Sequence, residues 1–510
     1  MLAKVNSGCI IGMNACHIEV EVDLSQSLPS FSVVGLPDTS IRESRDRIRS
    51  AIKNSGFAFP SGKITVNLSP AGLKKEGSGF DLPIAIGILC AEDLIEPETL
   101  NGLLLCGELS LNGKLKPIRG ALPLAIALKK KCDSFILPRQ NAGEAANIKE
   151  ISVFGADSLL NVSNHLKGIK PFEAVLSQKT SSYSPSYNND VDFRDVKGQE
   201  YVKRGLEVAA SGGHNLLLIG PPGSGKSMLA KRFPGILPEL LPEESLETTN
   251  VYSIAGELKN DQLIKKHPVR SRELFGHEKG AFTSANYEKR GLFHEADNGI
   301  LFLDEFPEFR RDVLEALRQP LESGYINISR VSHTFKYPSK FMLVAAMNPC
   351  PCGYFTDKTK NCHCTSHQIQ KYLAKISGPL LDRIDIHLEA PRLNYNQLST
   401  RRNGEYSSVI KKRVAITRDL QKNRFKKHKA IPRCNAGMSS KHLEKFCTLS
   451  SEAEELLKTA ILELGISARA YDKILKISRT IADMDNAEII ESHHLSEAVG
   501  YRCLDRNLWV

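Results

Sequence analysis

The sequence predicts an α/β protein made of three blocks, and three observations support this prediction. In the N-terminal part, short β-like runs alternate with amphipathic helical patterns. In the central part, an apolar strand leads into a glycine-rich turn and then into a helix. In the C-terminal part the pattern is helical throughout. The length of 510 residues suits three such blocks, since a domain usually has about 100–200 residues.

The N-terminal block is predicted to span residues 1–170. Strands are predicted at Ile18–Val22, Ser32–Gly35 and Lys63–Leu68, where β-branched and apolar residues gather. A helix is predicted over Ser40–Ser55, because its charges fall on one face. This alternation indicates an α/β domain.

Residues 171–191 are predicted to be a linker. Their core, SQKTSSYSPSYNND (177–190), is polar, rich in Ser and Tyr, and without periodicity. The central block is predicted to cover 192–395. The last block, 396–510, holds a basic segment followed by helical patterns. No internal repeat is evident.

Composition excludes several classes of protein. Hydrophobic residues make up 41% of the chain and charged residues 25%, which is typical of globular domains. No window approaches 18 uninterrupted apolar residues, so we expect no spanning helix and no membrane partner. The N-terminus lacks an apolar signal-peptide core. Twelve cysteines in this length fall well short of a disulfide scaffold, so we expect a reduced, cytoplasmic protein.

The positive charge is concentrated in one segment. The chain has a net charge of +10, and residues 411–433 alone carry ten Lys or Arg and one Asp. This run is either a solvated helix face or a surface that binds a polyanion. No helix-turn-helix or zinc-finger spacing appears, so contacts to nucleic acid would go to phosphates. The candidates for DNA contact here are Lys422, Arg424, Lys426 and Lys427, with Phe425 among them as an aromatic that could stack on a base.

Residues 220–227 read GPPGSGKS, a full match to the phosphate-binding P-loop pattern. The motif follows the apolar run 215–219 and precedes a helical run, which is the context that it requires. Glycines let backbone N–H groups face phosphate oxygens, Lys226 supplies a charge, and Ser227 offers a hydroxyl to Mg²⁺. The predicted nucleotide-binding residues are Gly220, Pro221, Pro222, Gly223, Ser224, Gly225, Lys226 and Ser227.

Two further apolar strands end in polar residues that suit the same site. The run ILFLDE (300–305) ends in Asp304, expected to hold Mg²⁺ through water, and Glu305, expected to polarise the attacking water. The run FMLVAAMNP (341–349) ends in Asn348, which could contact the γ-phosphate or that water. Phosphoryl transfer depends mostly on positioning and electrostatics, so these few groups suffice.

Four cysteines follow this asparagine closely: Cys350, Cys352, Cys362 and Cys364. Four thiolates within 15 residues suit tetrahedral Zn²⁺, with His363 and His367 as spare ligands. The C-x-C spacing is less usual than C-x₂-C. A zinc-stapled loop, a loop with incidental thiols, and an iron–sulfur cluster all remain open.

Several longer strings resemble one family. GGHNLLLIGPPGSGKSMLA, LFLDEFPEF, LEALRQPLESG, AAMNPCPCGY, SGPLLDRIDIHLE and ARAYDKILKISRTIADM are similar to the YifB/ComM family of magnesium-chelatase-like AAA+ ATPases, and N-terminal strings fit it too. The resemblance implies ATP, Mg²⁺, a hexameric ring and a DNA helicase that promotes branch migration in natural transformation. It also implies sensor 1 at Asn348, an arginine finger reaching the neighbouring subunit at Arg383, sensor 2 at Arg469, and an adenine pocket starting at Gly198 and Gln199.

The N-terminal block is similar to the Lon protease domain, an S5-like fold, through GELSLNGKLKPIRGALPLAIALKKKCDSFILPRQN (107–141). That resemblance implies a Ser–Lys dyad. Gly79 and Leu122 occupy the two matching positions, while Ser78 is out of register. We therefore expect a non-catalytic scaffold. Lys74 and Lys75 would either contact phosphates or be solvated.

One segment departs from the family. ELFGHEKGAFTSA (273–285) resembles the GAFTGA loop of sigma-54 activators. Phe282 would then be either a pore-loop tip that touches DNA or a hydrophobic anchor. The alternative functions are a protein-remodelling ATPase of the magnesium-chelatase or sigma-54-activator type. A Lon-type protease is disfavoured by Gly79 and Leu122.

Overall fold

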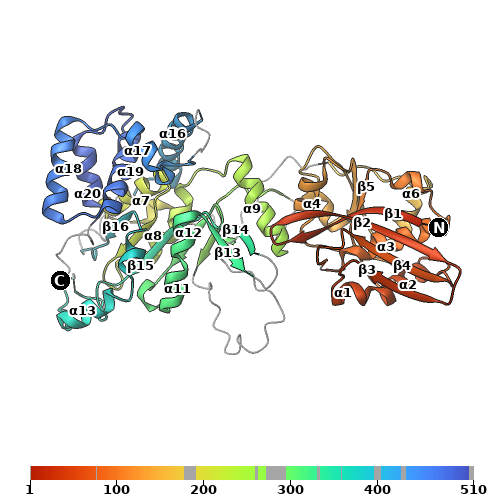
Figure 1. The fold of residues 1–510 in the computed structure, drawn as a ribbon. Coiled ribbons are helices and arrows are strands. Elements are labelled where there is room, and N and C mark those ends of the chain that lie inside the picture. The colour runs from red at the N-terminus through yellow and green to blue at the C-terminus, as the bar shows by residue number, and fades with distance from the viewer. Residues whose placement is uncertain are drawn as a thin grey trace. The chain divides into compact units, whose positions relative to one another are not determined.

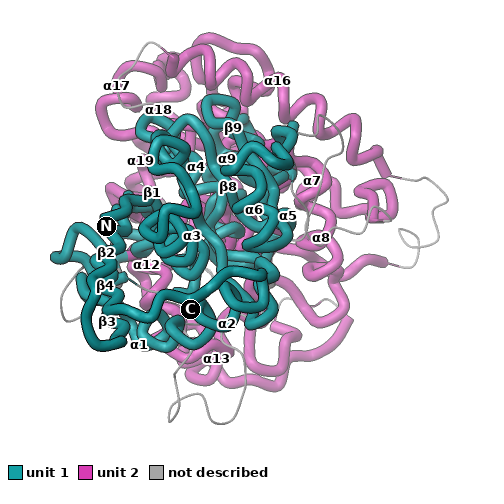
Figure 2. The backbone as a smooth tube through the Cα atoms, turned by 90° about the vertical axis from the view of Figure 1, so that its right-hand side faces the viewer, with its two compact units in different colours: residues 1–183, 241–265, 327–337 teal, residues 184–240, 266–326, 338–510 magenta. Residues whose placement is uncertain are grey.

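The computed structural model shows a mixed α/β protein (Figure 1), which confirms the predicted fold class at that level. The chain divides into two compact units (Figure 2). The first comprises residues 1–183, 241–265 and 327–337, and the second comprises residues 184–240, 266–326 and 338–510. The structure describes residues 2–75, 77–176, 191–258, 262–271, 295–329, 334–355, 357, 359–394, 404–426, 432–502 and 504.

The centre of the first unit is a sheet that has seven strands in the described residues. They are β1 (Leu2–Ile11), β2 (Asn14–Ser25), β3 (Ser30–Val34), β4 (Lys63–Ser69), β5 (Leu103–Leu105), β8 (Ser134–Pro138) and β9 (Ser152–Ala156). Their order is β3-β4-β2-β1-β5-β8-β9, antiparallel between β4, β2 and β1 and parallel elsewhere. On β2, alternate side chains (Ile18, Val20 and Val22) are fully buried, because strand residues point to opposite faces in turn. The three predicted strands fall on β2, β3 and β4.

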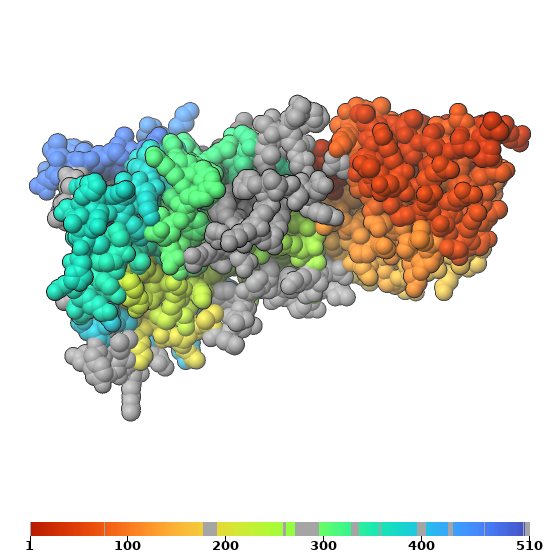
Figure 3. All heavy atoms as spheres, turned by 90° about the horizontal axis from the view of Figure 1, so that it is seen from below, coloured from red at the N-terminus to blue at the C-terminus, as the bar shows by residue number. Residues whose placement is uncertain are grey.

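The helices of the first unit differ from the prediction at one place. The helix predicted over 40–55 is two helices, because the backbone at Glu43 has a ψ of −15° and interrupts the run. The helices are α1 (Thr39–Arg42), α2 (Ser44–Asn54), α3 (Asp81–Ala91), α4 (Ala121–Leu128), α5 (Arg139–Ala145), α6 (Leu159–Leu166) and α9 (Pro242–Ala255). Short 3₁₀ turns lie at Ser78–Phe80 and Pro97–Leu100, and β6 (Glu108–Leu109) pairs with β7 (Leu115–Lys116). Seen as spheres, the N-terminal residues, coloured red to orange, pack without a break on the face that Figure 3 shows.

Helix α9 belongs to the first unit although it follows the P-loop in sequence. It packs on α4, where the Gly120 N–H donates to the Ser253 carbonyl at 3.1 Å. The Ser253 hydroxyl donates to the buried Glu144 carboxylate, which also accepts from the Leu122 N–H at 2.8 Å. Leu246 of α9 adds apolar contact to the same core. Nothing in the local sequence marks this helix as part of the N-terminal unit.

The second unit contains a parallel five-stranded sheet within the described residues, ordered β11-β12-β15-β10-β16. Its strands are β10 (Leu216–Ile219), β11 (Val269–Ser271), β12 (Ile300–Leu303), β15 (Met342–Met347) and β16 (Ile386–Glu389). All residues of β10 and β12 are buried, as expected for parallel strands covered on both faces. Leu216 and Leu218 face one apolar core and Leu217 and Ile219 face another.

Helices cover both faces of this sheet, and one apolar core lies on each face. They are α7 (Glu200–Gly212), α8 (Lys226–Arg232), α11 (Arg311–Ala316), α12 (Arg318–Ser323), α13 (Ser366–Leu373), α14 (Gly378–Leu381), α16 (Ser407–Phe425), α17 (Ser440–Phe446), α18 (Ser451–Leu464), α19 (Ala468–Met484) and α20 (Ser492–Gly500). Short 3₁₀ turns lie at Phe193–Asp195, Phe233–Ile236, Phe306–Glu308 and Asn435–Gly437. Strand β13 (Tyr325–Ser329) pairs with β14 (Thr334–Pro338), and residues 327–337 of these two strands belong to the first unit. Helices α16 and α19 both pack on α7, which agrees with the helical pattern predicted for the C-terminal block. None of the described helices is long and apolar enough to cross a membrane.

A buried ionic cluster ties α19 to the sheet. Asp385, 1% exposed and just before β16, accepts from the Asn215 N–H at 3.0 Å and pairs with Lys473 of α19. His214 lies 3.4 Å from the same carboxylate, and its other nitrogen contacts the Thr480 hydroxyl of α19 at 2.8 Å. Burial alone would raise the pKa of Asp385, but Lys473 and His214 hold it well below its usual range. The charge is therefore retained in the interior.

We expect Asp385→Asn to lower the free energy of unfolding by up to about 3 kcal/mol, because it removes the buried counter-charge of Lys473, whose side chain is 21% exposed. Since the native pKa of Asp385 is depressed, its contribution is complete above the unfolded pKa of about 4 and is lost as the pH falls through the native value. Urea unfolding followed by circular dichroism measures both effects. The control is Asp312→Asn, which removes an exposed pair with Arg310. Equal stability of the two variants at pH 7 would contradict the role of the cluster.

Candidate functional site

The P-loop joins β10 to α8, and its backbone requires glycine. Gly223 and Gly225 have φ of +79° and +87°, in the left-handed region that side chains disfavour. A Cβ on Gly220 would lie 2.2 Å from the Ala390 carbonyl oxygen. The loop therefore keeps its conformation only with glycine at positions 220, 223 and 225. Its N–H groups lie just before the N-terminus of α8, where an anion is favoured.

Lys226 points back into the loop. Its ammonium donates to the Gly220 carbonyl at 2.6 Å, to the Pro221 carbonyl at 3.0 Å and to Asn348 Oδ1 at 3.3 Å. Burial lowers its pKa to about 8, and the Asp304 carboxylate acts in the opposite direction. The cation thus lies among carbonyl oxygens that phosphate oxygens would replace.

The residues predicted to bind Mg²⁺ are in direct contact. The Ser227 hydroxyl donates to Asp304 Oδ2 at 2.7 Å, although 77 residues separate them. A hydroxyl and a carboxylate are oxygen ligands of the kind that Mg²⁺ prefers. Next to them, the Glu305 N–H donates to Asp304 Oδ1 at 2.9 Å. Glu305 is exposed and has a φ of +52°, an uncommon conformation for a residue other than glycine.

Gln199 supports the P-loop from the side. It is 8% exposed, and its amide donates to the Ser224 carbonyl at 2.7 Å and to the Pro391 carbonyl at 2.9 Å. Its Oε1 is buried and accepts no hydrogen bond from any residue that the structure describes. Both Gly198 and Gln199 have a φ of +56°. This tight turn places the amide beside the loop.

Both predicted arginines lie close to Asp382: Arg383 follows it in sequence, and Arg469 approaches its carboxylate. Arg383, just after α14, donates to the Pro379 carbonyl at 2.6 Å and pairs with Glu322, whose pKa it lowers. Arg469, in the first turn of α19, is 60% exposed and lies 3.8 Å from the Asp382 carboxylate. Among the described residues, neither arginine bonds to the P-loop. Glu322 was missed as a partner of Arg383, and only the family-like string LEALRQPLESG contained it.

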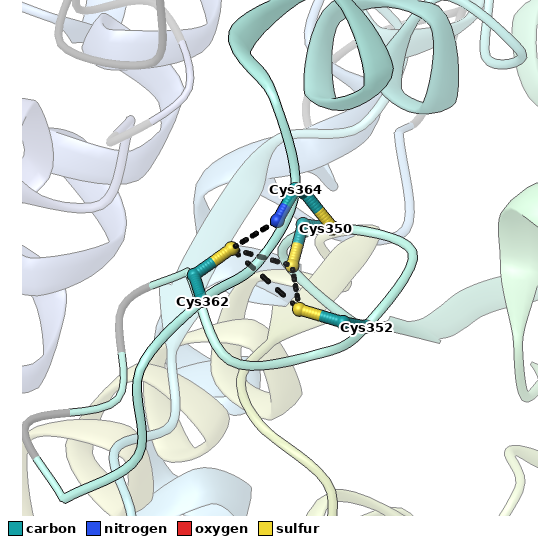
Figure 4. A group of neighbouring side chains, drawn as sticks. All are labelled: Cys350, Cys352, Cys362 and Cys364. Carbon is teal, nitrogen blue, oxygen red and sulfur yellow. Dashed lines mark hydrogen bonds between the residues drawn. The ribbon is translucent and has the colours of Figure 1, made fainter.

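The four cysteines predicted to bind metal converge (Figure 4). The Sγ atoms of Cys350 and Cys352 are 3.3 Å apart, those of Cys352 and Cys362 are 3.5 Å apart, and those of Cys350 and Cys362 are 3.7 Å apart. All four Sγ atoms lie within 4.8 Å of one another. The spacing of the four sulfur atoms is compatible with the binding of one metal ion.

The basic segment divides into engaged arginines and exposed lysines. Arg413 pairs with Glu207 and Glu405, and Arg424 pairs with Asp483. Lys422 and Lys426 are exposed and form no ion pair with a described residue. The hypothesis that Phe425 stacks on a base is wrong, because its ring is fully buried against Phe446. Lys427 and Phe282 lie outside the described residues.

The residues near the two positions that a Lon-type dyad would occupy form other contacts. Ser78 donates to Glu108, and Leu122 is fully buried. Lys75 is also fully buried, and its ammonium donates to the Gly35 carbonyl at 2.8 Å and to the Pro70 carbonyl. Both interpretations of Lys75, a phosphate contact and a solvated side chain, are therefore wrong.

Comparisons with known proteins match all parts of the chain to related families. Residues 192–398 match the family "Magnesium chelatase, subunit ChlI", residues 20–141 match "Subunit ChlI of Mg-chelatase", and residues 404–502 match "Magnesium chelatase, subunit ChlI C-terminal". The chain is 42% identical over 509 residues to competence protein ComM of Haemophilus influenzae, covering 99% of this chain and 98% of that protein. It is also 42% identical over 508 residues to YifB of Salmonella typhimurium, with the same coverage. A stretch of 192 residues, 37% of this chain and 32% of that protein, is 32% identical to the anaerobic nitric oxide reductase transcription regulator NorR of Escherichia coli.

We expect Lys226→Ala to raise the dissociation constant of ATP by about 10- to 100-fold, since a hydrogen bond to a charged group contributes about 1.5–3 kcal/mol. Titration with a fluorescent ATP analogue measures this change. The matched control is Lys231→Ala, an exposed lysine of the same helix. If Lys226→Ala bound the analogue as the wild type does, the loop would not be the phosphate site.

Proposed function

Because the chain belongs to the YifB/ComM family of magnesium-chelatase-like AAA+ ATPases, we propose that it is a ring-forming, ATP-dependent DNA motor, a branch-migration helicase of natural transformation and recombination. The proposed ATPase activity is supported mainly by direct contacts between the P-loop and two motifs that are distant in sequence. Lys226 reaches Asn348 across 122 residues and Ser227 reaches Asp304 across 77. The P-loop, Asp304 and Asn348 follow β10, β12 and β15, and β15 lies between the other two strands in one parallel sheet.

The residues divide the work of hydrolysis as follows. P-loop N–H groups and Lys226 hold the phosphates, and Ser227 and Asp304 hold Mg²⁺, which neutralises charge on the β- and γ-phosphates. Glu305 orients and polarises the attacking water, and Asn348 contacts that water or the γ-phosphate. Gly198 and Gln199 border the adenine. Besides ATP and Mg²⁺, the cofactors include a structural Zn²⁺ at the four cysteines.

A ring completes the site in this proposal. Arg383 would leave Glu322 and reach the ATP of the neighbouring subunit, while Arg469 acts within its own subunit. Support comes from the position of Arg383 in a loop directly before β16, beside the exposed Glu322. A hexamer is the expected assembly, and the cytoplasm is the expected compartment.

The DNA part rests on the exposed lysines of α16 and on the relative named competence protein ComM. Lys422, Lys426 and Lys427 would contact phosphates, and Phe282 would touch the DNA as a pore-loop tip. Arg424 contributes to folding through Asp483, so we give it no contact with DNA. Recognition would be independent of sequence, with single-stranded or branched DNA as the partner.

The remaining blocks have supporting roles in this proposal. Residues 1–170 form a Lon-like, S5-like scaffold without protease activity and 171–191 form a linker. Residues 192–395 form the AAA+ domain, of which 241–265 and 327–337 pack with the first unit, and 396–510 form the lid. The hydrogen bond of Ser78 to Glu108 and the burial of Leu122 support the absence of a Ser–Lys dyad.

A protein-remodelling ATPase, of the magnesium-chelatase or sigma-54-activator type, is the second candidate. The 192-residue similarity to the regulator NorR favours it. ATPase assays with single-stranded, duplex and branched DNA separate the two candidates. We expect branched or single-stranded DNA to stimulate hydrolysis, and an absence of stimulation by any DNA would favour the second candidate.

We expect Glu305→Gln to bind ATP normally and to reduce turnover by about 10²–10⁴-fold, because the amide cannot act as a base toward the water. Steady-state ATPase rates and equilibrium ATP binding measure the two effects separately. Glu308→Gln, an exposed glutamate three residues away, is the control. Turnover at the wild-type rate in Glu305→Gln would refute the catalytic assignment.

We expect the double variant Lys422→Gln/Lys426→Gln to weaken DNA binding and to flatten its salt dependence. Each lost phosphate contact removes about 0.7–0.9 from the slope of log K against log salt concentration. The control is Lys441→Gln/Lys458→Gln, which changes charge equally on α17 and α18. If the slope for Lys422→Gln/Lys426→Gln were the same as for the wild type, the basic run would be a solvated helix face and not a DNA-binding surface.

A further inference from the structure

The sulfur atoms of the four-cysteine cluster have the spacing of ligands around one ion. Zn–S bonds of about 2.3 Å in a tetrahedron separate the sulfurs by about 3.8 Å. The three separations among the Sγ atoms of Cys350, Cys352 and Cys362, 3.3, 3.5 and 3.7 Å, approach this value. None of the four cysteines forms a disulfide. A multi-iron cluster would hold thiolates of different irons farther apart, because the irons lie between them.

Backbone donors reinforce the thiolate character of the cluster. The Gly353 N–H donates to Cys350 Sγ at 3.2 Å, and the Cys364 N–H donates to Cys362 Sγ at 3.4 Å (Figure 4 shows the second). Both C-x-C pairs thus supply one sulfur that accepts a backbone hydrogen bond. Hydrogen bonds to ligand atoms orient them and stabilise their charged form, as around metal sites generally.

The cluster is in contact with the nucleotide site. Gly353 has a φ of +86°, and a Cβ there would lie 2.6 Å from Pro222 Cδ of the P-loop and 3.8 Å from Asn348 Cγ. Cys350 is buried and comes two residues after Asn348. The backbone of the cysteine loop therefore packs directly on the P-loop and on the polar residue that contacts Lys226.

The far end of the loop is tied to the core of the second unit. Cys364 precedes Thr365, which caps α13 by accepting from the Gln368 N–H. Ile369 and Tyr372 of that helix are buried. Between Asn348 and Thr365, the described residues form no helix or strand. The four sulfurs are thus the element that brings the two ends of this segment together, and closing such a loop without a crosslink costs entropy.

We infer that zinc at Cys350, Cys352, Cys362 and Cys364 positions the nucleotide site, holding Gly353 against Pro222 and Asn348 beside Lys226, so that ATP turnover depends on the metal. This inference rests on the proposed ATP site. Zinc here takes no part in phosphoryl transfer. Its four thiolates leave no open position for water or substrate, which is typical of a structural site.

The test uses the full chain and three readouts: zinc per chain by mass spectrometry, binding of a fluorescent ATP analogue, and kcat. We expect one zinc per chain in the wild type and its loss in Cys362→Ser. Turnover should then fall by about 10²-fold, the loss that a displacement of about 1 Å at a reacting group produces. Cys362→His should recover zinc and most of the activity, because histidine is also a zinc ligand.

A second pair of variants separates positioning from metal binding. Gly353→Ala should retain zinc yet weaken ATP binding and turnover, because its Cβ meets Pro222. The control is Gly72→Ala, where a Cβ has open space. Cys16→Ser, a half-buried cysteine of the first unit, is the matched control for the cysteine variants.

Removal of zinc from the folded wild type by a thiol-reactive chelator, followed by re-addition, tests the same dependence without mutation. Wild-type ATP binding and kcat in the zinc-free protein would overturn the inference and leave the proposed ATPase intact. An absence of zinc from the wild type, or iron in its place, would also overturn it. A fully zinc-loaded wild type that hydrolyses no ATP would instead refute the proposed function.

Discussion

The parallel pairing of β15 with β10 on one side and β12 on the other is the constraint on which the site depends. Parallel strands end at the same edge of a sheet, so residues that directly follow them become neighbours whatever their sequence separation. The P-loop follows β10, Asp304 follows β12 and Asn348 follows β15. The hydrogen bonds of Lys226 to Asn348 and of Ser227 to Asp304 are consequences of that order. Without this pairing, each motif would be an isolated loop.

Two devices hold this edge from outside the sheet. Gln199 fastens the turn before α7 to the P-loop through the Ser224 carbonyl. Gly353 brings the cysteine loop against Pro222. Both contacts use residues with positive φ, where the backbone comes close to a neighbouring loop. The shape of the phosphate site therefore depends on these two contacts as well as on the motif itself.

Charged side chains in the interior of the second unit form ion pairs that stabilise the fold, whereas lysines on its surface remain exposed to solvent. The buried Asp385 pairs with Lys473 and ties α19 to the sheet, and the buried Asp483 pairs with Arg424 and ties α19 to α16. Arg469 begins the same helix that carries Lys473, so the pair at Asp385 also fixes the helix that presents Arg469. Because arginines of the basic run are engaged inside the unit, the exposed cations of α16 are mainly lysines.

The sequence by itself determined the α/β class, the P-loop, the two acidic residues after β12 and the cysteine spacing, because each is encoded within a few consecutive residues. Only the tertiary structure decided the burial of Phe425 and Lys75, the partners of Arg424 and Arg383, the assignment of α9 to the first unit, and the contact between Gly353 and Pro222. These features join residues that are far apart in sequence, and local periodicity carries no information about which distant group will fill a given space. Helix α16 is an example. The sequence shows its run of cations, but which of these cations remain exposed depends on the acidic residues of other helices.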